Sequence, residues 1–360
     1  MSATALDPES SLSSSGHEDG LGRRVLGFDR ETGTMLERLV LRPELGAFEI
    51  ALRERMAVVA ALEDERFARP RELDRDADNH LAVVSDYVAG RRLCDVLDAA
   101  AEHGIVGGLD AGLGLLLELL PAIARLHDAG LAHGAIAPGR VMVTPERQLV
   151  LLDAIYAEPL ERLQLTRRRL WSELRLAFPP TAGVVRFDRT ADLSHAAMVA
   201  VSVVLGRPLR DDDYPNGITA LRQEILEIAS IRGSKSFAES VDKFFVGALP
   251  LAGKRTTMSA DEAASDLRKL IRKELGITTC RTALVEFFQQ VETADIERVV
   301  AEALAGESRP NRETERAEAE RNERERLQRA ALVGGRDAED HAHRASIPEE
   351  CGGCGVAGGS

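Results

Sequence analysis

The most constraining feature of the sequence is a pair of stretches too apolar to lie on a protein surface. AGLGLLLELLPAIARLHDAG, residues 111–130, is apolar on most faces of a helix, and such a helix must be buried on nearly all sides. DLSHAAMVAVSVVLG, from Asp192, is a second such stretch, with an acidic residue at its positive end and a glycine where it stops. Two buried helices predict a large helical lobe.

A shorter, mixed segment precedes this lobe. RRVLGF and MLERLVLRP are apolar runs separated by the turn-like DRETG, which predicts a β-hairpin. Residues 47–62 carry apolar side chains at helical spacing, and HLAVVSDYV, residues 80–88, is typical of a buried strand. Further along, RVMVTPERQLVLLDA predicts two short strands around a turn. We therefore expect a small lobe over residues 21–88 and a helical lobe over residues 89–275.

The two ends of the chain have a different character. Residues 1–20 are rich in Ser, Asp and Gly without periodicity, which predicts a disordered lead. Ser259 and Glu262 fit a capping box at a helix start, and a helical extension is expected over residues 276–305. Residues 306–360 are charged with few apolar anchors, which indicates a solvated helix or disordered segment and then a mobile tail.

Charge and composition exclude several classes of protein. Phosphate binding needs clustered Lys and Arg, so a formal net charge of -13 argues against a nucleic-acid surface. The longest apolar runs are too short or too interrupted to cross a bilayer, and the N-terminus lacks the pattern of a secretory signal. Four scattered cysteines do not make a disulfide framework. We expect a cytoplasmic protein with no membrane segment and no nucleic-acid partner.

Four motifs in register resemble the eukaryotic-type protein kinase family, which includes the bacterial serine/threonine kinases. LHDAGLAHGAIAPGRVMVTPERQLVLLDAI, residues 126–155, is similar to the family's LHxxGxxHRDLKPxNI, hairpin and DFG segment. SDYVAGRRL resembles the hinge, and ADLSHAAMVAVSVVLGRPL and KRTTMSADEAASDL resemble later motifs. The similarity spans about residues 22–273. It implies a protein-kinase-like two-lobed α+β fold, with a small, mostly antiparallel five-stranded lobe and a larger helical lobe.

The catalytic positions implied by this resemblance carry the wrong side chains. Phosphoryl transfer depends on positioning and on charges placed around the phosphates. Ala135 stands where the family has the aspartate that orients the substrate hydroxyl, and Ala137 where it has a lysine. Arg140, a cation, replaces the asparagine that binds the second magnesium ion. Of the four polar catalytic positions in this segment, three therefore carry side chains that cannot perform the family's function.

The small lobe departs from the family in the same way. TGTMLERLVLRPE resembles TGxxVALKVLxPE, which puts Leu39 at the phosphate-binding lysine, and the chain has no lysine before Lys235. Arg38 is adjacent, but neighbouring strand residues point to opposite faces. Glu54 best matches the helix glutamate that pairs with this lysine, with Glu49 as the alternative. No phosphate-cradling glycine loop is found between Gly22 and Gly33.

Other family positions are retained. Asp153 matches the magnesium-binding aspartate, as a metal ligand or as a cap at the end of a strand, although one carboxylate holds Mg²⁺ poorly. The resemblance gives structural roles to His133, which braces the catalytic loop, and to Asp192 and Arg255, which hold the large lobe together. Asp86 and Val88 match the hinge that contacts the nucleotide.

Two further patterns leave alternatives open. LTRRRLW, residues 165–171, lies where an activation segment is expected and is either a solvated basic face or a phosphate-binding site. His341, His343, Cys351 and Cys354 are zinc-compatible donors, but structural zinc sites usually present two spaced pairs in a compact module, which favours a mobile tail.

These observations favour a catalytically inactive pseudokinase that acts as a binding or allosteric module in cytoplasmic signalling. The partner is then a protein, such as another kinase or signalling protein, and no cofactor is expected. The alternative is a divergent active serine/threonine kinase that binds Mg-ATP weakly through Asp153, with Arg38 or Arg140 as a relocated cation.

Overall fold

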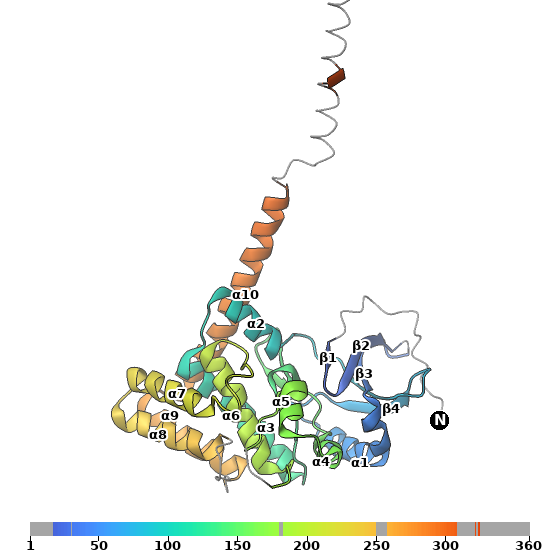
Figure 1. Cartoon of the computed structure of the whole chain (residues 1–360), viewed down its shortest axis with the longest axis horizontal. Coiled ribbons are helices and arrows are strands. Elements are labelled where there is room, and N and C mark those ends of the chain that lie inside the picture. The colour runs from blue at the N-terminus through green and yellow to red at the C-terminus, as the bar shows by residue number, and fades with distance from the viewer. Residues whose placement is uncertain are drawn as a thin grey trace, which may run out of the picture. The chain divides into compact units, whose positions relative to one another are not determined.

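The computed structural model describes residues 17–29, 31–179, 183–249 and 258–307, with 321, 323 and 324. The small lobe is a five-stranded antiparallel sheet in the order β1-β2-β3-β5-β4, with helix α1 packed beside β4 (Figure 1). Its elements are β1 (Glu18–Asp19), β2 (Gly22–Phe28), β3 (Met35–Leu41), a 3-10 helix η2 (Pro43–Phe48), α1 (Glu49–Ala60), β4 (Pro70–Arg75) and β5 (Leu81–Asp86).

The register of the central hairpin decides which side chains face the large lobe. Strands β2 and β3 form the predicted hairpin, with Arg24 opposite Leu39 and Gly22 opposite Leu41. Leu39 and Leu41 are both 2% exposed, because this face of β3 covers the core under the sheet. Leu39 thus fills, with an apolar side chain, the position matched to the family's lysine.

The start of the chain differs from the expectation. Residues 17–20, which we placed in the disordered lead, form strand β1 and a turn, and the Gly20 amide donates to the carbonyl of Glu173 in the large lobe. The carbonyl of His17 also accepts from the amide of Arg24. The contact of Gly20 with Glu173 is long-range, and no local pattern could have indicated it.

The large lobe is built around the two apolar helices. They are α3 (Gly108–Asp128) and α6 (Arg189–Leu205), and they pack directly on each other. A Cβ on Gly112 of α3 would lie 2.3 Å from Cγ2 of Val204, so glycine permits this close approach. Helix α6 begins before Asp192, because the side chain of Asp188 caps it by accepting from the amides of Thr190 and Ala191.

The remaining elements surround this pair of helices. A second sheet, in the order β6-β7-β8, lies at the start of the large lobe and carries the turn with the 3-10 helix η3. The bounds are β6 (Arg91–Arg92), α2 (Leu93–His103), η3 (Pro138–Arg140), β7 (Val141–Val143), β8 (Leu149–Leu151), α4 (Ala157–Leu163), α5 (Arg167–Leu174), α7 (Ile218–Arg232), α8 (Lys235–Ala248), α9 (Ala260–Glu274) and α10 (Ile277–Glu307).

Helix α10 corresponds to the expected helical extension. The chain divides into two compact units at Asp295 and Ile296, within this helix. The part of α10 up to Asp295 packs on the large lobe: a Cβ on Gly114 of α3 would lie 2.2 Å from the carbonyl oxygen of Cys280. The expected mobile tail, apart from the end of α10 and residues 321, 323 and 324, lies outside the described residues.

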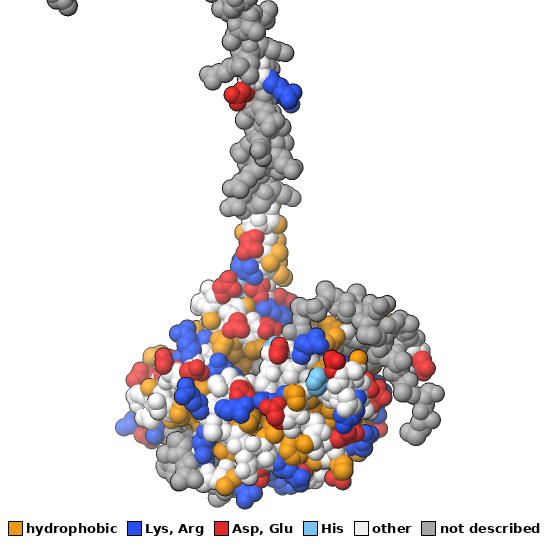
Figure 2. Space-filling view, turned by 45° about the vertical axis from the view of Figure 1, so that its right-hand side comes forward, with side chains coloured by type: hydrophobic (Ala, Val, Ile, Leu, Met, Phe, Trp, Pro, Cys, Tyr) orange, Lys and Arg blue, Asp and Glu red, His pale blue; other side chains and the backbone are white. Residues whose placement is uncertain are grey.

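Charged side chains of both signs are mixed on the surface. Lys and Arg side chains are interspersed with Asp and Glu over the face shown in Figure 2, without a large area of one sign. Among the described residues, none of the helices combines the length and the apolar character needed to cross a bilayer.

The capping box at the start of α9 gives a test of the fold. The Ser259 hydroxyl accepts from the Glu262 amide, and the Glu262 carboxylate accepts from the Ser259 amide. We expect Ser259→Ala to lower the free energy of unfolding by about 1 kcal/mol, measured by urea denaturation, because the Glu262 amide loses its acceptor. Ser259→Asp, which can still cap, should lose much less. An equal loss in both variants would contradict this role.

Candidate active site

One buried carboxylate binds the first residues of the catalytic loop, residues 133–140. Asp192 is fully buried on α6 and accepts from Nε2 of His127 at 2.9 Å and from the amides of His133 and Gly134 at 2.8 and 2.7 Å. Burial alone would raise the pKa of this carboxyl, but the His127 hydrogen bond and the backbone donors hold it below its ordinary value. Asp192 thus joins α6 to His127 of α3 and to the first residues of the loop.

His133 is the first residue of this loop. Its ring is fully buried, and Nδ1 accepts from the amide of Ala135 at 3.2 Å. Burial lowers the pKa of His133 to about 4, so the imidazole is neutral at physiological pH. Ala135 and Ala137 are buried as well, at 0% and 2% exposure, and contribute only methyl groups. The loop therefore carries no charged side chain at positions 135 and 137.

Asp153 follows β8 and meets two guanidinium groups. Arg24 Nη2 lies 2.5 Å from Asp153 Oδ2 and Nη1 lies 3.3 Å from Oδ1, so the contact is bidentate. Arg140 Nε is 3.7 Å from the same Oδ2. Burial would raise the pKa of Asp153, but Arg24 and then Arg140 keep it below its ordinary value. Both carboxylate oxygens that could bind a metal ion are engaged by Arg24.

Arg24 is the residue that the sequence analysis missed. It lies on β2, opposite Leu39, and its side chain is 4% exposed. Its Nη1 also donates to Glu37 Oε1 at 2.7 Å. Burial would lower the pKa of Arg24, but Asp153 and Glu37 raise it further above its ordinary value. The resemblance places the cation of the site on the strand at residues 35–41 and expects a lysine there, so it gives no signal for an arginine on β2.

Arg140, at the position matched to a metal ligand, makes contacts with the protein instead. Its Nη2 donates to Asp19 Oδ2 at 2.7 Å, and Nη1 donates to the carbonyls of Leu174 and Ala135 at 3.1 and 3.4 Å. Asp19 comes from β1 and also accepts from the amide of Leu21. Arg140 therefore joins the small lobe to the catalytic loop.

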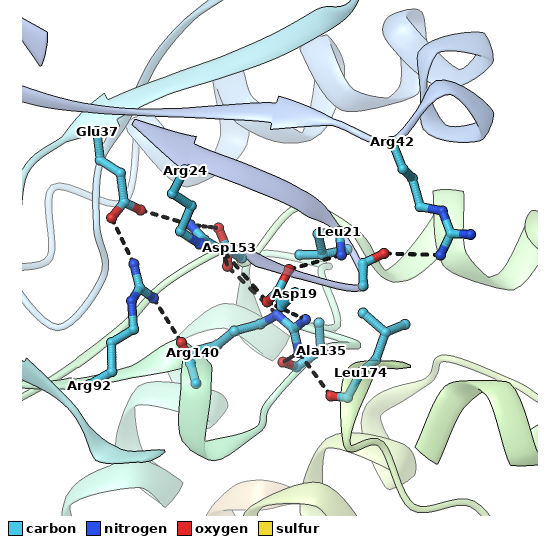
Figure 3. A network of polar contacts seen from close by, with 12 residues as sticks. Asp19, Leu21, Arg24, Glu37, Arg42, Arg92, Ala135, Arg140, Asp153 and Leu174 are labelled. Carbon is cyan, nitrogen blue, oxygen red and sulfur yellow. Dashed lines mark hydrogen bonds and ion pairs between the residues drawn. The ribbon is translucent and has the colours of Figure 1, made fainter. Parts of the chain in front are cut away.

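Arg92 completes the group on the other side of the cleft. Its Nη2 donates to Glu37 Oε2 and its Nη1 to the carbonyl of Gly139, both at 2.7 Å. The result is one chain of alternating charges, which we call the arginine–carboxylate network (Figure 3). Its members, in order of contact, are Arg92, Glu37, Arg24, Asp153, Arg140 and Asp19. Three guanidinium groups face three carboxylates, so the network is electrically balanced.

Two predicted small-lobe residues lie outside the network. Glu54 is exposed on α1 and makes no ion pair or hydrogen bond within the described part of the chain, so its role in nucleotide binding stays a prediction. The alternative, Glu49, pairs at the surface with Arg53 and Arg75. Helix α1 instead reaches the large lobe through Arg55, which donates to the carbonyls of Ile155 and Ala132.

The other predicted cation is also placed elsewhere. Arg38 Nη2 pairs with Asp74 Oδ2 of β4 at 2.9 Å, away from the network. This is the outcome expected when successive residues of a strand point to opposite faces. Of the two suggested relocated cations, Arg140 contacts Asp153 and Arg38 does not.

The hinge residues have ordinary contacts. The Asp86 carboxylate pairs with Arg71 Nε at 2.6 Å. Val88 packs against a small apolar cluster made by Met142, Val150, Leu152 and Ala68. These contacts support a structural role and leave the expected nucleotide contact as a prediction.

The basic segment 165–171 is partly committed to local contacts. It contributes to α5, where Arg169 pairs with Glu173 and Arg167 donates to the carbonyls of Pro179 and Gly183. Trp171 is 5% exposed and donates to Asp211. Arg255, His341, His343, Cys351 and Cys354 lie outside the described residues.

Comparisons with known proteins agree with this geometry. No family model matches the chain. The chain is 25% identical over 243 residues to the serine/threonine-protein kinase PksC of Streptomyces coelicolor, covering 64% of this chain and 43% of that protein. It is 30% identical over 141 residues to the serine/threonine-protein kinase PknG of Mycolicibacterium smegmatis, covering 37% of this chain and 18% of that protein. The chain thus spans less than half of the length of these relatives.

Solved structures show the same fold. The PknI kinase domain of Mycobacterium tuberculosis, in a point-mutant form, aligns with a TM-score of 0.50 and 19% identity, over 74% of this chain and 99% of that domain. The maize SIRK1 kinase domain, bound to AMP-PNP, aligns with a TM-score of 0.52 and 14% identity, over 74% of this chain and 96% of that chain. At this level of identity the likeness concerns the fold alone. The two-lobed α+β prediction is confirmed: the chain has a protein-kinase-like fold, and the sequence relatives named above are serine/threonine-protein kinases.

Proposed function

We propose that the chain is a pseudokinase, a kinase-like domain that does not transfer phosphate and works as a protein-binding or allosteric module in cytoplasmic signalling. One observation carries the proposal: both oxygens of Asp153 are engaged by Arg24. Mg²⁺ is bound through carboxylate and substrate oxygens at near-ideal octahedral geometry. A metal ion at Asp153 must therefore displace a buried, bidentate guanidinium.

The surrounding residues support this proposal. Ala135 offers no acceptor for a substrate hydroxyl proton, and Ala137 offers no cation for the transferred phosphate. Arg140, at the position matched to the second metal ligand, brings positive charge toward Asp153. A cleft built in this way lacks the charges that phosphoryl transfer requires.

A second candidate function, a divergent active serine/threonine kinase, is favoured by the same arginine. Arg24 reaches Asp153 from the strand next to the one where the family carries its lysine, and Arg140 approaches from the large lobe. In this alternative the network opens, Arg24 contacts the phosphates, and Asp153 binds Mg²⁺. An acid to orient the substrate hydroxyl is still missing at position 135.

Nucleotide binding separates the two candidates. For the full chain, we expect no rise in thermal midpoint on adding millimolar Mg-ATP, because the network occupies the metal position. A ligand at 100 times its Kd stabilises by about 2.7 kcal/mol, which such a measurement detects readily. An active kinase measured in parallel is the positive control. A rise that Asp153→Asn abolishes, together with label moving from ATP to a peptide, would establish the active alternative.

The network itself predicts a large difference between two arginines. Arg24→Met leaves buried Asp153 without its bidentate partner, so we expect the free energy of unfolding to fall by about 3–5 kcal/mol at neutral pH. Arg38→Met is the matched control on the paired strand. It removes a contact with the half-exposed Asp74 and should cost about 1 kcal/mol or less. Equal losses in the two variants would contradict the importance of the network.

The same variant has a predicted pH dependence. In the native protein the folded pKa of Asp153 is depressed, so its stabilising contribution is present above the unfolded pKa and is lost as pH falls through the folded pKa. In Arg24→Met the main cause of that depression is gone, and burial raises the pKa of Asp153 toward or above its unfolded value. We therefore expect the stability deficit of Arg24→Met to shrink as pH is lowered from neutral toward about 4. A deficit independent of pH would exclude Asp153 as its cause.

A further inference from the structure

A cavity of about 280 Å³ lies beside the catalytic loop, and the hinge residues Asp86 and Val88 are not part of its lining. One face of α6 lines it with four residues at helical spacing: His195, Met198, Val199 and Ser202. Leu174 and Trp171 of α5, Leu209, and Asp98 of α2 form other walls. An engineered apolar cavity of about 150 Å³ binds benzene, so this volume accommodates a ring with a short side chain.

A second, independent observation is an unsatisfied histidine in its wall. His195 is 1% exposed, and neither ring nitrogen has a hydrogen-bond partner among the described residues. Its ring packs edge-on against Phe178 at 4.9 Å. Burial lowers the pKa of His195 to about 4, so the ring is neutral and offers one donor and one acceptor. A buried polar group without a partner is costly, which indicates that something else satisfies it.

The charges of the lining select the kind of ligand. The two arginines, Arg140 and Arg175, are paired with Asp19 and Asp211, so no cation is available for an anionic ligand among the described lining residues. At the rim, Asp98 makes no ion pair or hydrogen bond within the described ranges. Burial and the nearby Asp95 raise the pKa of Asp98, as expected for a carboxylate that lacks a cation.

We propose that this cavity binds a compact organic amine, with its apolar body between α5 and α6 beside His195 and its ammonium group at Asp98. Met198, Val199, Leu174 and Leu209 cover the body, as in most small-molecule sites, which are largely apolar with a few polar groups. Neither Arg24 nor Asp153 lines the cavity, although Arg140 and Asp19 of the network do, so binding of an amine is tested apart from binding of a nucleotide.

The chain carries its own reporter for a test. Trp171 is the single tryptophan of the sequence and lines the cavity, so its emission responds to a ligand there. Three probes share one ring and differ in the end group: phenethylamine, 2-phenylethanol and 3-phenylpropionate. They can be titrated into the full chain while Trp171 is excited beyond their absorption. We expect saturable changes, with phenethylamine binding about threefold to fivefold more tightly than the alcohol and 3-phenylpropionate binding most weakly.

Variants assign the effect to its residues. Asp98→Asn should remove the preference for the amine, while Asp261→Asn, an equal change of charge on exposed α9, should retain it. Leu209→Phe, which fills the cavity, should weaken binding of all three probes. If Leu209→Phe does not fold, the probe order and Asp98→Asn still decide. No saturable change with phenethylamine, or a preference unaffected by Asp98→Asn, would overturn the proposal. The nucleotide test is read from the thermal midpoint with Mg-ATP, so its outcome is distinguishable from the outcome of these amine titrations.

Discussion

The ion pair between Arg24 and Asp153 is the contact on which the rest of the cleft depends. It joins β2 of the small lobe to the segment after β8 of the large lobe, and both side chains are nearly excluded from water. Each charge alone would be expensive to bury, so neither residue is tolerable without the other. The same requirement extends to the residues around this pair. Glu37 contacts Arg24 and is itself paired with Arg92. Arg140 contacts Asp153 and is itself paired with Asp19. The network therefore joins the two lobes through a continuous series of ion pairs.

Arginine is suited to this work in a way that lysine is not. Its planar fork makes a bidentate contact with Asp153 and still reaches Glu37, and Arg140 bonds a carboxylate and two carbonyls at once. Outside the network, Arg42 pairs with Glu173, and Arg55 binds the carbonyls of Ile155 and Ala132. The contacts between the lobes thus rely repeatedly on arginine, in a chain without lysine before Lys235.

The fold was predictable from the sequence where local patterns determine it. The apolar helices α3 and α6 and the hairpin β2–β3 follow from periodicity, and Asp192 and His133 from motif spacing. The network was not predictable from the sequence. Alternation along a strand predicts which face of the sheet a side chain lies on, but it does not predict which strand contributes the arginine that pairs with Asp153. Arg24 replaces a lysine expected on β3, and Asp19 lies in a segment whose composition indicated disorder. Glu54 is exposed on α1, as expected for a helix glutamate that has no lysine to pair with.

The energies involved explain why a retained aspartate need not mean a retained nucleotide site. A micromolar Kd corresponds to about 8 kcal/mol of binding free energy. Removing one partner of a buried ion pair costs about 3–5 kcal/mol, so opening two such pairs uses most of that amount. Phosphates could pair again with Arg24 and Arg140, but Glu37 and Asp19 would then face a polyphosphate of the same sign. In a kinase the carboxylates of the cleft are balanced by metal ions that arrive with the substrate. Here arginine side chains already neutralise the carboxylates Glu37, Asp153 and Asp19, and Mg-ATP has to compete with these ion pairs.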